Sequence, residues 1–528
     1  MGARSGEQYL ENLRANQPEV YLAGRRVPDV TAEPIFAGPL RSIMEQYDLQ
    51  LRPDTVDIMT TLDPATGERY STGFLVPRSA EDLARRRRSY KLRTDHTFGF
   101  MGRAPDFMNA LLTDLYVSRD QFGRVEPRYA ENLADYYRLV RDDDLFLTHT
   151  LINPQTDRTR TSAEQEDPFT HLGRVEANTD GIIVRGAKML GTMAPLTEET
   201  MVFPFGGIAP GDERYALGFS LPNNAPGLRY VCRETVAPGP RSRYDHPLSS
   251  RFEEMDCIAI FDDVLVPWER VFIDGGGEAA REVCNNLRPR EGIVAVQTAS
   301  RMLSQLEFFC GLAMRLADAT GITEFLHVQE KLGEMLQELE LFRAAYFGAE
   351  AMGGPGRDGV WSVHQPALTA ANLRAPRIYG RLVEIVQILA GGGFFYAPTE
   401  ADLANPELRP ALDRYVRGRP GVSAEERIAL FKLAWDVTGD GFGSRMAQYV
   451  RFYSGDPIRN TAGYYVGYPT KEPLFDTVDR ALGGGGDDLA VPPSPEDPRD
   501  RPGMQRPTPG SLRGTYPSAS QPASRTAG

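Results

Sequence analysis

The spacing of apolar residues changes twice along this 528-residue chain, and this change restricts the folds open to it. Between about 150 and 275, short runs alternate polar and apolar residues and are separated by Gly, Pro and Asn, which is typical of half-buried antiparallel strands. On either side, apolar residues recur at three- and four-residue spacings, as on the buried face of a helix. The sequence therefore predicts a β domain between two helical domains. The expected strands lie within 181–190, 214–222, 228–236 and 257–266.

The first region, residues 1–147, is predicted to be mainly helical, with one extended interruption at Ser71–Val76. The clearest helix covers Tyr129–Phe146, where the apolar side chains form a single stripe. This helix should end just before Thr148 and His149, so these two residues would open the β domain.

Two long segments of the C-terminal region carry apolar seams of the kind that pack helices into a bundle. The first seam runs from Val328 to Tyr346, and the second runs from Ile378 to Leu389 and stops at Gly391–Gly393. A further helix should start near Ser423, because acidic residues occupy its first turn. These features predict a helical bundle over residues 277–482.

The complete prediction is an α+β protein with a mainly helical domain over 1–147, a β-barrel-like antiparallel domain over 148–276, and the bundle. This order is that of the acyl-CoA dehydrogenase-like architecture, in which flavin lies between the β domain and the bundle. Residues 483–528 are rich in Gly, Pro, Ser, Asp and Arg, with almost no large apolar residue. We expect this tail to be disordered, because it cannot bury enough surface to offset its ordering entropy.

Composition limits the partners. The formal net charge is -13, which disfavours a nucleic acid. No apolar run approaches the roughly 20 residues of a membrane span, and the N-terminus lacks the pattern of a secretory signal. The four cysteines are widely spaced and form no Cys-x-x-Cys pair, which argues against a disulfide framework and against a zinc ribbon. We therefore expect a cytoplasmic protein with no metal, no membrane and no nucleic-acid partner.

Five contiguous blocks of the sequence carry a specific resemblance. Together they resemble the 4-hydroxyphenylacetate 3-hydroxylase (monooxygenase) oxygenase family, in the order in which the family has them, and the similarity runs from about residue 5 to 480. The blocks are FMGRAPDFMNA (100–110), THTLINPQTDR (148–158), RGAKMLGT (185–192), HPLSSRFEEMDCIAIFDDVLVPWERVF (246–272) and RFYSGDPIR (451–459).

The resemblance implies the oxygenase component of a two-component flavin monooxygenase. In this family a separate NAD(P)H:flavin reductase supplies reduced FAD, which forms a flavin C4a-hydroperoxide with O2 and hydroxylates a phenolic substrate ortho to its hydroxyl. The sequence agrees, because no strand is followed by the Gly-x-Gly-x-x-Gly that binds a dinucleotide tightly. Gly439–Gly443 lacks a preceding strand, and we interpret it as a helix kink or packing site. The family also implies a homotetramer formed through the bundle, with a homodimer as the alternative, and the apolar seams are consistent with either an internal bundle or a subunit interface.

The resemblance assigns Arg103 and His149 to catalysis and substrate binding. Oxygen transfer is an electrophilic attack on the ring, so a cation that stabilises a phenolate and an imidazole that takes the phenol proton would both promote it. Without the resemblance, Arg103 would be interpreted as a helix-cap ion pair with Asp106, and His149 as a buried histidine with satisfied hydrogen bonds.

The same resemblance implies a flavin-binding set. Polar groups in loops can bind the isoalloxazine edge and the pyrophosphate, although any loop would carry such groups. The expected cofactor-binding residues are His149, Gln155, Thr156, Asp157, Arg158, Thr192, Ser454, Gly455, Asp456 and Arg459.

One residue departs from the family pattern. The family has Ser-Pro-Asp-Tyr where this chain has Ala104–Phe107, and Phe107 cannot make the hydrogen bond of the tyrosine to the substrate oxygen. Losing one uncharged hydrogen bond costs about 0.5–1.5 kcal/mol, which is enough to change the preferred substrate but not to abolish catalysis. Phe205 falls where the family contacts the far end of the substrate. Free 4-hydroxyphenylacetate, a halophenol, a carrier-tethered tyrosine derivative and a non-phenolic aromatic of secondary metabolism all fit.

Three other functions compete with this one. A 4-hydroxybutyryl-CoA dehydratase needs iron–sulfur cysteines in the N-terminal domain, whereas the first cysteine here is Cys232. An acyl-CoA dehydrogenase needs a carboxylate base beside the flavin, and the candidates Glu334, Glu338 and Glu384 have the spacing of helix-surface residues. A non-catalytic homologue that retains the fold as a binding subunit is the third.

Overall fold

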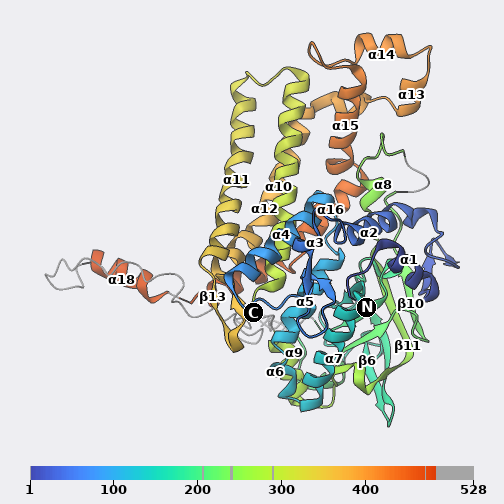
Figure 1. The fold of residues 1–528 in the computed structure, drawn as a ribbon, viewed down its shortest axis with the longest axis vertical. Helices are drawn as coiled ribbons and strands as arrows, with labels where there is room; N and C mark the ends of the chain where they lie inside the picture. The colour runs from blue at the N-terminus through green and yellow to red at the C-terminus, as the bar shows by residue number, and fades with distance from the viewer. Residues whose placement is uncertain (1, 205–206, 238–241, 288–290, 470, 483–528) are drawn as a thin grey trace, which may run out of the picture.

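The fold was taken from a computed structural model that describes residues 2–204, 207–237, 242–287, 291–469 and 471–482. Figure 1 shows the long helices α10, α11 and α12 side by side at one end, the strands at the other end, and the N-terminal helices α4 and α5 between them. This arrangement confirms the predicted α+β class and its order of helical, β and helical parts. The predicted division at residues 147 and 276 stays a prediction, and the tail over 483–528 lies outside the described residues.

The N-terminal region is mainly helical, as predicted. The helix predicted over Tyr129–Phe146 is α7, and Tyr129, Leu133 and Val140 on its stripe are buried. It ends earlier than predicted because Asp144 adopts a left-handed backbone conformation, with φ of 47°. The helices are α1 (Gly6–Ala15), α2 (Ala37–Leu49), α3 (Val56–Met59), α4 (Ala80–His96), α5 (Pro105–Val117), α6 (Asp120–Gly123) and α7 (Pro127–Asp143).

The strands of the middle region form two sheets. The six-stranded sheet has the order β2-β1-β10-β11-β7-β6, and the four-stranded sheet has the order β12-β9-β8-β5. The strands are β1 (Glu19–Leu22), β2 (Arg25–Val27), β5 (Leu147–Thr150), β6 (Gly173–Ala177), β7 (Gly181–Lys188), β8 (Glu199–Val202), β9 (Gly218–Pro222), β10 (Leu228–Cys232), β11 (Cys257–Pro267) and β12 (Val271–Ile273). Each of the four predicted strand segments therefore contains an observed strand. The short helix α8 (Ser249–Phe252) precedes β11.

Two details of these sheets differ from the sequence prediction. β1 and β2 come from the N-terminal region, and β1 pairs in parallel with β10. β5 also pairs in parallel, with β8, whereas most other pairs are antiparallel as predicted. β1 and β2 contain four and three residues, which is too short for an alternating pattern to identify them. A separate small hairpin is formed by β3 (Thr60–Leu62) and β4 (Arg69–Ser71), close to the predicted extended interruption.

The C-terminal region is a helical bundle, as predicted. The seam of α11 buries Val328, Met335, Leu339, Phe342 and Tyr346, and the seam of α12 is buried in the same way. Ser423 begins α15 with a reciprocal capping box to Glu426. The helices are α9 (Glu278–Asn286), α10 (Ile293–Thr320), α11 (Leu326–Ala351), α12 (Gln365–Ala390), α13 (Glu400–Ala404), α14 (Arg409–Tyr415), α15 (Ala424–Thr438), α16 (Gly441–Phe452), α17 (Pro457–Val466) and α18 (Glu472–Ala481). A small hairpin, β13 (Gly354–Pro355) with β14 (Trp361–Ser362), follows α11.

One helical segment, Gln365–Tyr396, is long and apolar enough by composition to cross a membrane. It consists of α12 and the 3-10 turn that follows it, and α12 packs against α10, α11, α15 and α16 in the bundle. Core helices of bundles share this composition, so the segment is weak evidence for a membrane span.

Candidate active site

The start of α5 and the strand β5 bring the two predicted catalytic residues to one place. Arg103 lies two residues before Pro105, the first residue of α5, and His149 lies on β5 opposite Met201 of β8. The ring of Phe107, in the first turn of α5, contacts both residues. Its centroid is 4.1 Å from Cζ of Arg103 and 5.7 Å from the ring centroid of His149. Arg103, Phe107 and His149, predicted from separate blocks, therefore form one cluster.

The guanidinium of Arg103 is buried, with 8% of the residue exposed, yet its Nε and Nη1 atoms have no hydrogen-bond partner among the described residues. Its cationic carbon contacts two neighbouring rings, 4.1 Å from the centroid of Phe107 and 4.4 Å from that of Tyr453. Within the described ranges no carboxylate forms a salt bridge with it. The Oδ1 of Asp106 instead accepts from Gln297 at 3.4 Å. Buried polar groups are normally paired, so this guanidinium is suited to an acceptor supplied by a ligand.

His149 is equally buried, and its Nδ1 has no hydrogen-bond partner in the part of the chain that the structure describes. Burial, together with the positive charge of Arg103, lowers the pKa of His149 well below its ordinary value. The imidazole is therefore neutral near pH 7 and can accept a hydrogen bond there.

A row of carboxylates just before β11 fixes this cluster to the bundle. Glu254 accepts from the backbone N of Arg103 at 2.6 Å and from Nη1 of Arg445 at 2.9 Å. Asp256 accepts from Nη2 of Arg445 at 2.8 Å and from Nε of Arg233 at 3.0 Å. Although burial raises the pKa of Asp256, the two arginines hold it below its ordinary value, so this carboxylate is charged. Arg445 lies on α16, so the row joins the β region to the bundle.

Thr192, a predicted flavin residue, is connected to this network. Its hydroxyl donates to Oδ1 of Asp256 at 2.7 Å, and its carbonyl accepts from the Thr148 hydroxyl at 2.6 Å. Because Thr148 precedes His149 on β5, Thr192 lies close to the cluster. The polypeptide around it is sharply bent, and Met193 has a φ of 67°.

The predicted flavin loop Gln155–Arg158 follows β5 and is exposed. Among the described residues, its side chains make their hydrogen bonds within the loop: Thr156 donates to Gln165 at 2.7 Å, and Asp157 accepts from the backbone N of Thr159 at 2.9 Å. The amide of Gln165 also donates to the carbonyl of Asp157 at 2.9 Å, so it organises the loop. The role of the loop in flavin binding stays a prediction.

The predicted late flavin block follows Tyr453, the C-cap of α16, and runs into the first turn of α17. Gly455 has a φ of 96°, which favours glycine, and Asp456 accepts from the backbone N of Arg459 at 2.8 Å as the N-cap of α17. Asn460 donates to the carbonyl of Ser454 at 2.8 Å. Tyr453 brings the start of this block to Arg103, whereas Arg459 is exposed. The cofactor roles of Ser454, Gly455, Asp456 and Arg459 stay predictions, and Phe205 lies outside the described residues.

Sequence reasoning missed the bundle side of the cluster. Arg445, Tyr449 and Tyr453 follow one another at four-residue spacing, which places them on one face of α16 and its C-cap. Cζ of Arg103 is 5.6 Å from the ring of Tyr449, and Cζ of the buried Arg301 on α10 is 4.1 Å from the ring of Tyr453. The four-residue spacing was visible in the sequence, but nothing local connected it to Arg103.

The glycine-rich segment Gly439–Gly443 is a packing site, as interpreted from the sequence. A Cβ on Gly443 would lie 2.5 Å from the backbone of Val437, so only glycine fits there. Asp440 caps α16 by accepting from the backbone N of Gly441 at 2.7 Å. His246 Nδ1 lies 3.3 Å from Oδ2 of Asp440, and Asp436 accepts from the backbone N of Leu248 at 2.7 Å. These contacts connect the segment that begins with His246 to α15 and α16 and support its interpretation as a structural turn.

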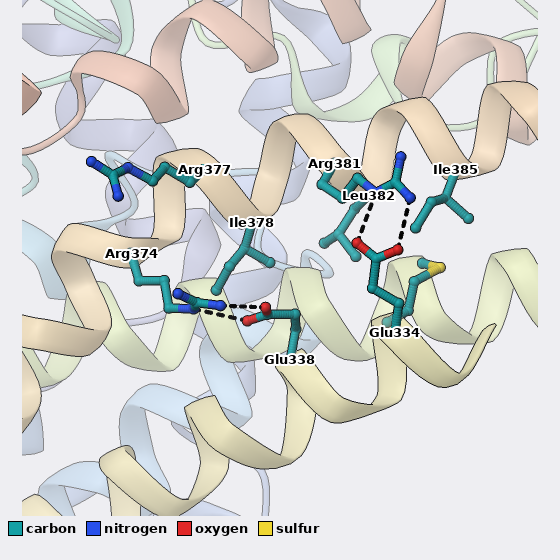
Figure 2. Close-up of a pocket in the computed structure, with 9 residues that line it drawn as sticks. Glu334, Glu338, Arg374, Arg377, Ile378, Arg381, Leu382 and Ile385 are labelled. Carbon is teal, nitrogen blue, oxygen red and sulfur yellow. Dashed lines mark hydrogen bonds and ion pairs between the residues drawn. The ribbon is translucent and has the colours of Figure 1, made fainter. Parts of the chain in front are cut away.

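A groove of about 250 Å³ lies elsewhere, between α11 and α12 (Figure 2). Glu334 binds Arg381 through two hydrogen bonds of 2.7 Å, and Glu338 pairs with Arg374. Figure 2 shows these pairs bridging the two helices on the bundle surface. Glu334 and Glu338 are therefore surface carboxylates, as interpreted from the sequence, and Glu384 also pairs with Arg381. The residues that line this groove do not include Arg103 or His149.

Comparisons with known proteins match the chain almost throughout. The model of the 4-hydroxyphenylacetate 3-hydroxylase N-terminal domain matches residues 5–273, and that of the C-terminal domain matches residues 285–483. The 4-hydroxyphenylacetate 3-monooxygenase oxygenase component of Thermus thermophilus is 42% identical, covering 90% of this chain and 96% of the relative. The oxygenase component of a Rhodococcus 4-nitrophenol 2-monooxygenase is 34% identical, covering 86% and 85%.

Among solved structures, the crystal structure of a 4-hydroxyphenylacetate 3-monooxygenase oxygenase component complexed with FAD and 4-hydroxyphenylacetate is 41% identical to this chain. It has a TM-score of 0.85, and the alignment covers 91% of this chain and 99% of that one. The likeness therefore extends over both helical regions and the β region between them.

Proposed function

Because the chain belongs to the 4-hydroxyphenylacetate 3-hydroxylase family, and is the oxygenase component of a two-component flavin monooxygenase, we propose that Arg103 and His149 activate its phenolic substrate. The enzyme uses reduced FAD and O2 to hydroxylate an aromatic ring ortho to a hydroxyl. The observation that carries the proposal is the pair of buried, unpartnered nitrogen groups on Arg103 and His149. Such groups are costly unless a ligand satisfies them.

The residues present fit a flavin beside this cluster. Nδ1 of His149 lacks a partner among the described residues, and Thr192 is held rigidly by Asp256 at its hydroxyl. We propose that Thr192 and His149 bind the isoalloxazine edge, and that the Gln155–Arg158 loop and the Ser454–Arg459 block hold the rest of FAD. When bound, the reduced flavin supplies the electrons that activate O2.

Arg103 is charged and His149 is neutral, and this difference defines their roles. Arg103 binds the substrate oxygen through its free Nε and Nη1 and stabilises that oxygen as a phenolate. His149, neutral in the free enzyme, accepts the phenol proton as Arg103 takes up the phenolate charge, because the phenolate offsets the positive charge of Arg103 that helps to lower the pKa of His149. The rings of Phe107 and Tyr453 cover the guanidinium, which reduces competition from water for its charge. Deprotonation makes the ring more nucleophilic toward the electrophilic oxygen.

For the substrate we propose a free 4-hydroxylated aromatic, of which 4-hydroxyphenylacetate and substituted phenols are the first compounds to test. A non-phenolic or carrier-tethered aromatic is the second candidate, because Phe107 lacks the hydroxyl that the family tyrosine offers. The partner that supplies reduced FAD is a separate NAD(P)H:flavin reductase. We propose that the enzyme works in the cytoplasm, which fits the four cysteines, all free thiols.

We further propose that the bundle forms the subunit contacts of a homotetramer, with a homodimer as the alternative. The outer side chains of α11 include exposed large apolar residues, Leu336, Leu341 and Phe347, and α12 exposes Ile388. Exposed large apolar side chains on these two helices favour an interface formed through the bundle. Light scattering of the purified protein measures the mass directly and distinguishes the two states.

The test of the activity is an aerobic assay with FAD, NADH and a generic flavin reductase over a panel of phenols and non-phenolic aromatics, with products identified by mass. We expect a product heavier by one oxygen from at least one phenol, and no such product without the oxygenase. Turnover of non-phenolic aromatics alone would contradict the roles of Arg103 and His149, because neither would have a phenol to ionise.

A further inference from the structure

Three aromatic rings surround the guanidinium of Arg103, and they differ in the hydroxyl that each can offer to a ligand. Phe107 has none. The hydroxyl of Tyr453 donates to the carbonyl of Gly102 at 2.8 Å, so its proton is already used. The hydroxyl of Tyr449 is shielded from solvent and has no hydrogen-bond partner in the described part of the chain. By elimination, Tyr449 carries the one free donor on these rings.

The position of this hydroxyl is fixed from two sides. A Cβ placed on Gly102 would lie 2.5 Å from the Tyr449 oxygen, so the hydroxyl end of the ring packs directly on the backbone that precedes Arg103. On its other face, Cζ of Arg445 lies 4.1 Å from the ring centroid, and Arg445 is itself held by Glu254 and Asp256. The ring therefore has little freedom to turn away from Arg103.

Burial keeps the proton of the Tyr449 hydroxyl in place. Burial raises the pKa of Tyr449 well above its ordinary value, although Arg103 opposes this and Glu254 adds to it. A protonated hydroxyl that is buried without an acceptor costs free energy, and an anionic oxygen bound at Arg103 would recover that cost.

We propose that Tyr449 is a substrate-binding residue that donates a hydrogen bond to the phenolic oxygen held by Arg103, and so supplies the donor that Phe107 lacks. This inference rests on the proposed function and deepens it. It assigns the ligand class as aromatic compounds that carry an ionisable hydroxyl, because a donor pair of Arg103 and Tyr449 stabilises a phenolate more than a neutral oxygen.

The substrate oxygen then accepts hydrogen bonds from two residues that are far apart in the sequence. Arg103 precedes α5 in the N-terminal region, whereas Tyr449 lies on α16 in the bundle. Phe107→Tyr would place a second tyrosine hydroxyl at the same guanidinium. The variant Phe107→Tyr/Tyr449→Phe therefore moves the donor from one ring to the other and leaves the rest of the cluster unchanged.

The test measures ligand binding apart from turnover. The oxygenase is loaded with FAD, reduced anaerobically with NADH and a flavin reductase, and titrated with 4-nitrophenol, whose phenolate is visibly coloured. Nitrobenzene, which lacks the hydroxyl, is the second ligand. The variants are Tyr449→Phe, the exchange variant Phe107→Tyr/Tyr449→Phe, and Tyr244→Phe as a matched control, since the Tyr244 hydroxyl donates to the carbonyl of Glu425 far from this cluster.

We expect Tyr449→Phe to weaken 4-nitrophenol binding by about ten-fold to a hundred-fold and to raise the pH at which the bound ligand becomes coloured. Nitrobenzene binding should stay within two-fold of the parent, roughly the scatter of such titrations. The exchange variant should recover part of the loss, and Tyr244→Phe should match the parent.

Equal weakening of both ligands by Tyr449→Phe would assign Tyr449 a structural role and overturn the inference, as would unchanged binding of 4-nitrophenol. Failure of this inference can be told apart from failure of the proposed function. If the parent enzyme hydroxylates phenols and Tyr449→Phe binds 4-nitrophenol as the parent does, only the role of Tyr449 is refuted. A parent enzyme that hydroxylates no phenol refutes the proposed function itself.

Discussion

Arginines in two regions of the molecule differ in how their charge is satisfied. In the groove of α11 and α12, Arg381 and Arg374 are partly exposed, and each donates two hydrogen bonds to one glutamate. In the cluster at α5 and β5, Arg103 is buried, and two of its guanidinium nitrogens have no partner among the described residues. A paired surface arginine is already satisfied, whereas a buried unpaired one indicates a ligand. The contrast, more than the volume of the groove, supports the proposal that the active site lies at Arg103.

The sharpest test of this comparison is Arg103→Met, which removes the cation and roughly preserves the volume. We expect hydroxylation to fall by about 10²–10³-fold, because a preorganised donor to the developing anion is lost. The rate of product formation by mass measures the loss. Arg419→Met, at an exposed pair with Asp318, is the matched control and should keep the parent rate. A variant that retained a tenth of the activity would contradict the role of Arg103 as the phenolate-binding cation.

His149→Gln comes next, with an expected loss of about 10²-fold in turnover, the lower end of what general acid–base catalysis contributes. The pKa of His149 is lowered in the folded state from an ordinary value of 6.5. Below pH 6.5, His149 therefore binds a proton in the unfolded chain but stays neutral in the folded chain. Folding stability contributed by this residue is therefore complete above pH 6.5 and is lost as the pH falls toward the folded pKa.

The measurement for His149→Gln is urea unfolding of parent and variant at pH 7.5 and at pH 5.5. We expect the variant to lose less stability than the parent between these two pH values, because glutamine takes up no proton. A parallel loss in both proteins would mean that His149 is not a buried neutral imidazole.

Phe107→Tyr should have a smaller effect, because it adds one hydroxyl beside a donor that Tyr449 already provides. We expect the kcat/KM for simple phenols to rise by about two- to ten-fold, which corresponds to one neutral hydrogen bond. The ratio of the rate for a phenol to that for a larger substituted phenol, measured in parent and variant, shows whether the replacement altered specificity. No change with any phenol would place Phe107 away from the reacting oxygen.

Arg374→Met tests the other side of the comparison and should have the smallest effect. An exposed pair such as Arg374 with Glu338 contributes about 1 kcal/mol or less, so turnover per subunit should stay within two-fold of the parent. Thermal unfolding and light scattering report its effect on stability and assembly. A loss of activity as large as that of Arg103→Met would remove the distinction between the two regions.

Much of this architecture could be predicted from local sequence patterns. The stripe of α7 and the seams of α11 and α12 repeat every three or four residues, and the capping box at Ser423 lies within four residues, so each could be identified in a single segment. The short strands β1 and β2 could not, because the four residues of β1 become recognisable as a strand only when they pair with β10, more than 200 residues away, and β2 pairs with β1. The parallel pairing of β5 with β8 is likewise a property of the assembled sheet.

The candidate site divides in the same way. Motif resemblance alone named Arg103 and His149, and the structure brought them together with Phe107. The loop Gln155–Arg158 and the Ser454–Arg459 block stay predictions, since their described contacts are internal or serve as helix caps. Tyr449 was missed because its significance depends on Gly102, in a different region of the chain.

The sequence by itself determined the order of helical, β and helical regions, the family, and the chemical types required for hydroxylation, because periodicity and motifs are local properties of a chain. Only the tertiary structure decided which of these groups are buried, paired or free. Tyr453 and Gly102 are 351 residues apart yet share a hydrogen bond, and that contact uses one tyrosine hydroxyl while leaving the hydroxyl of Tyr449 available. Availability depends on the surroundings of an atom in three dimensions, which no linear pattern records.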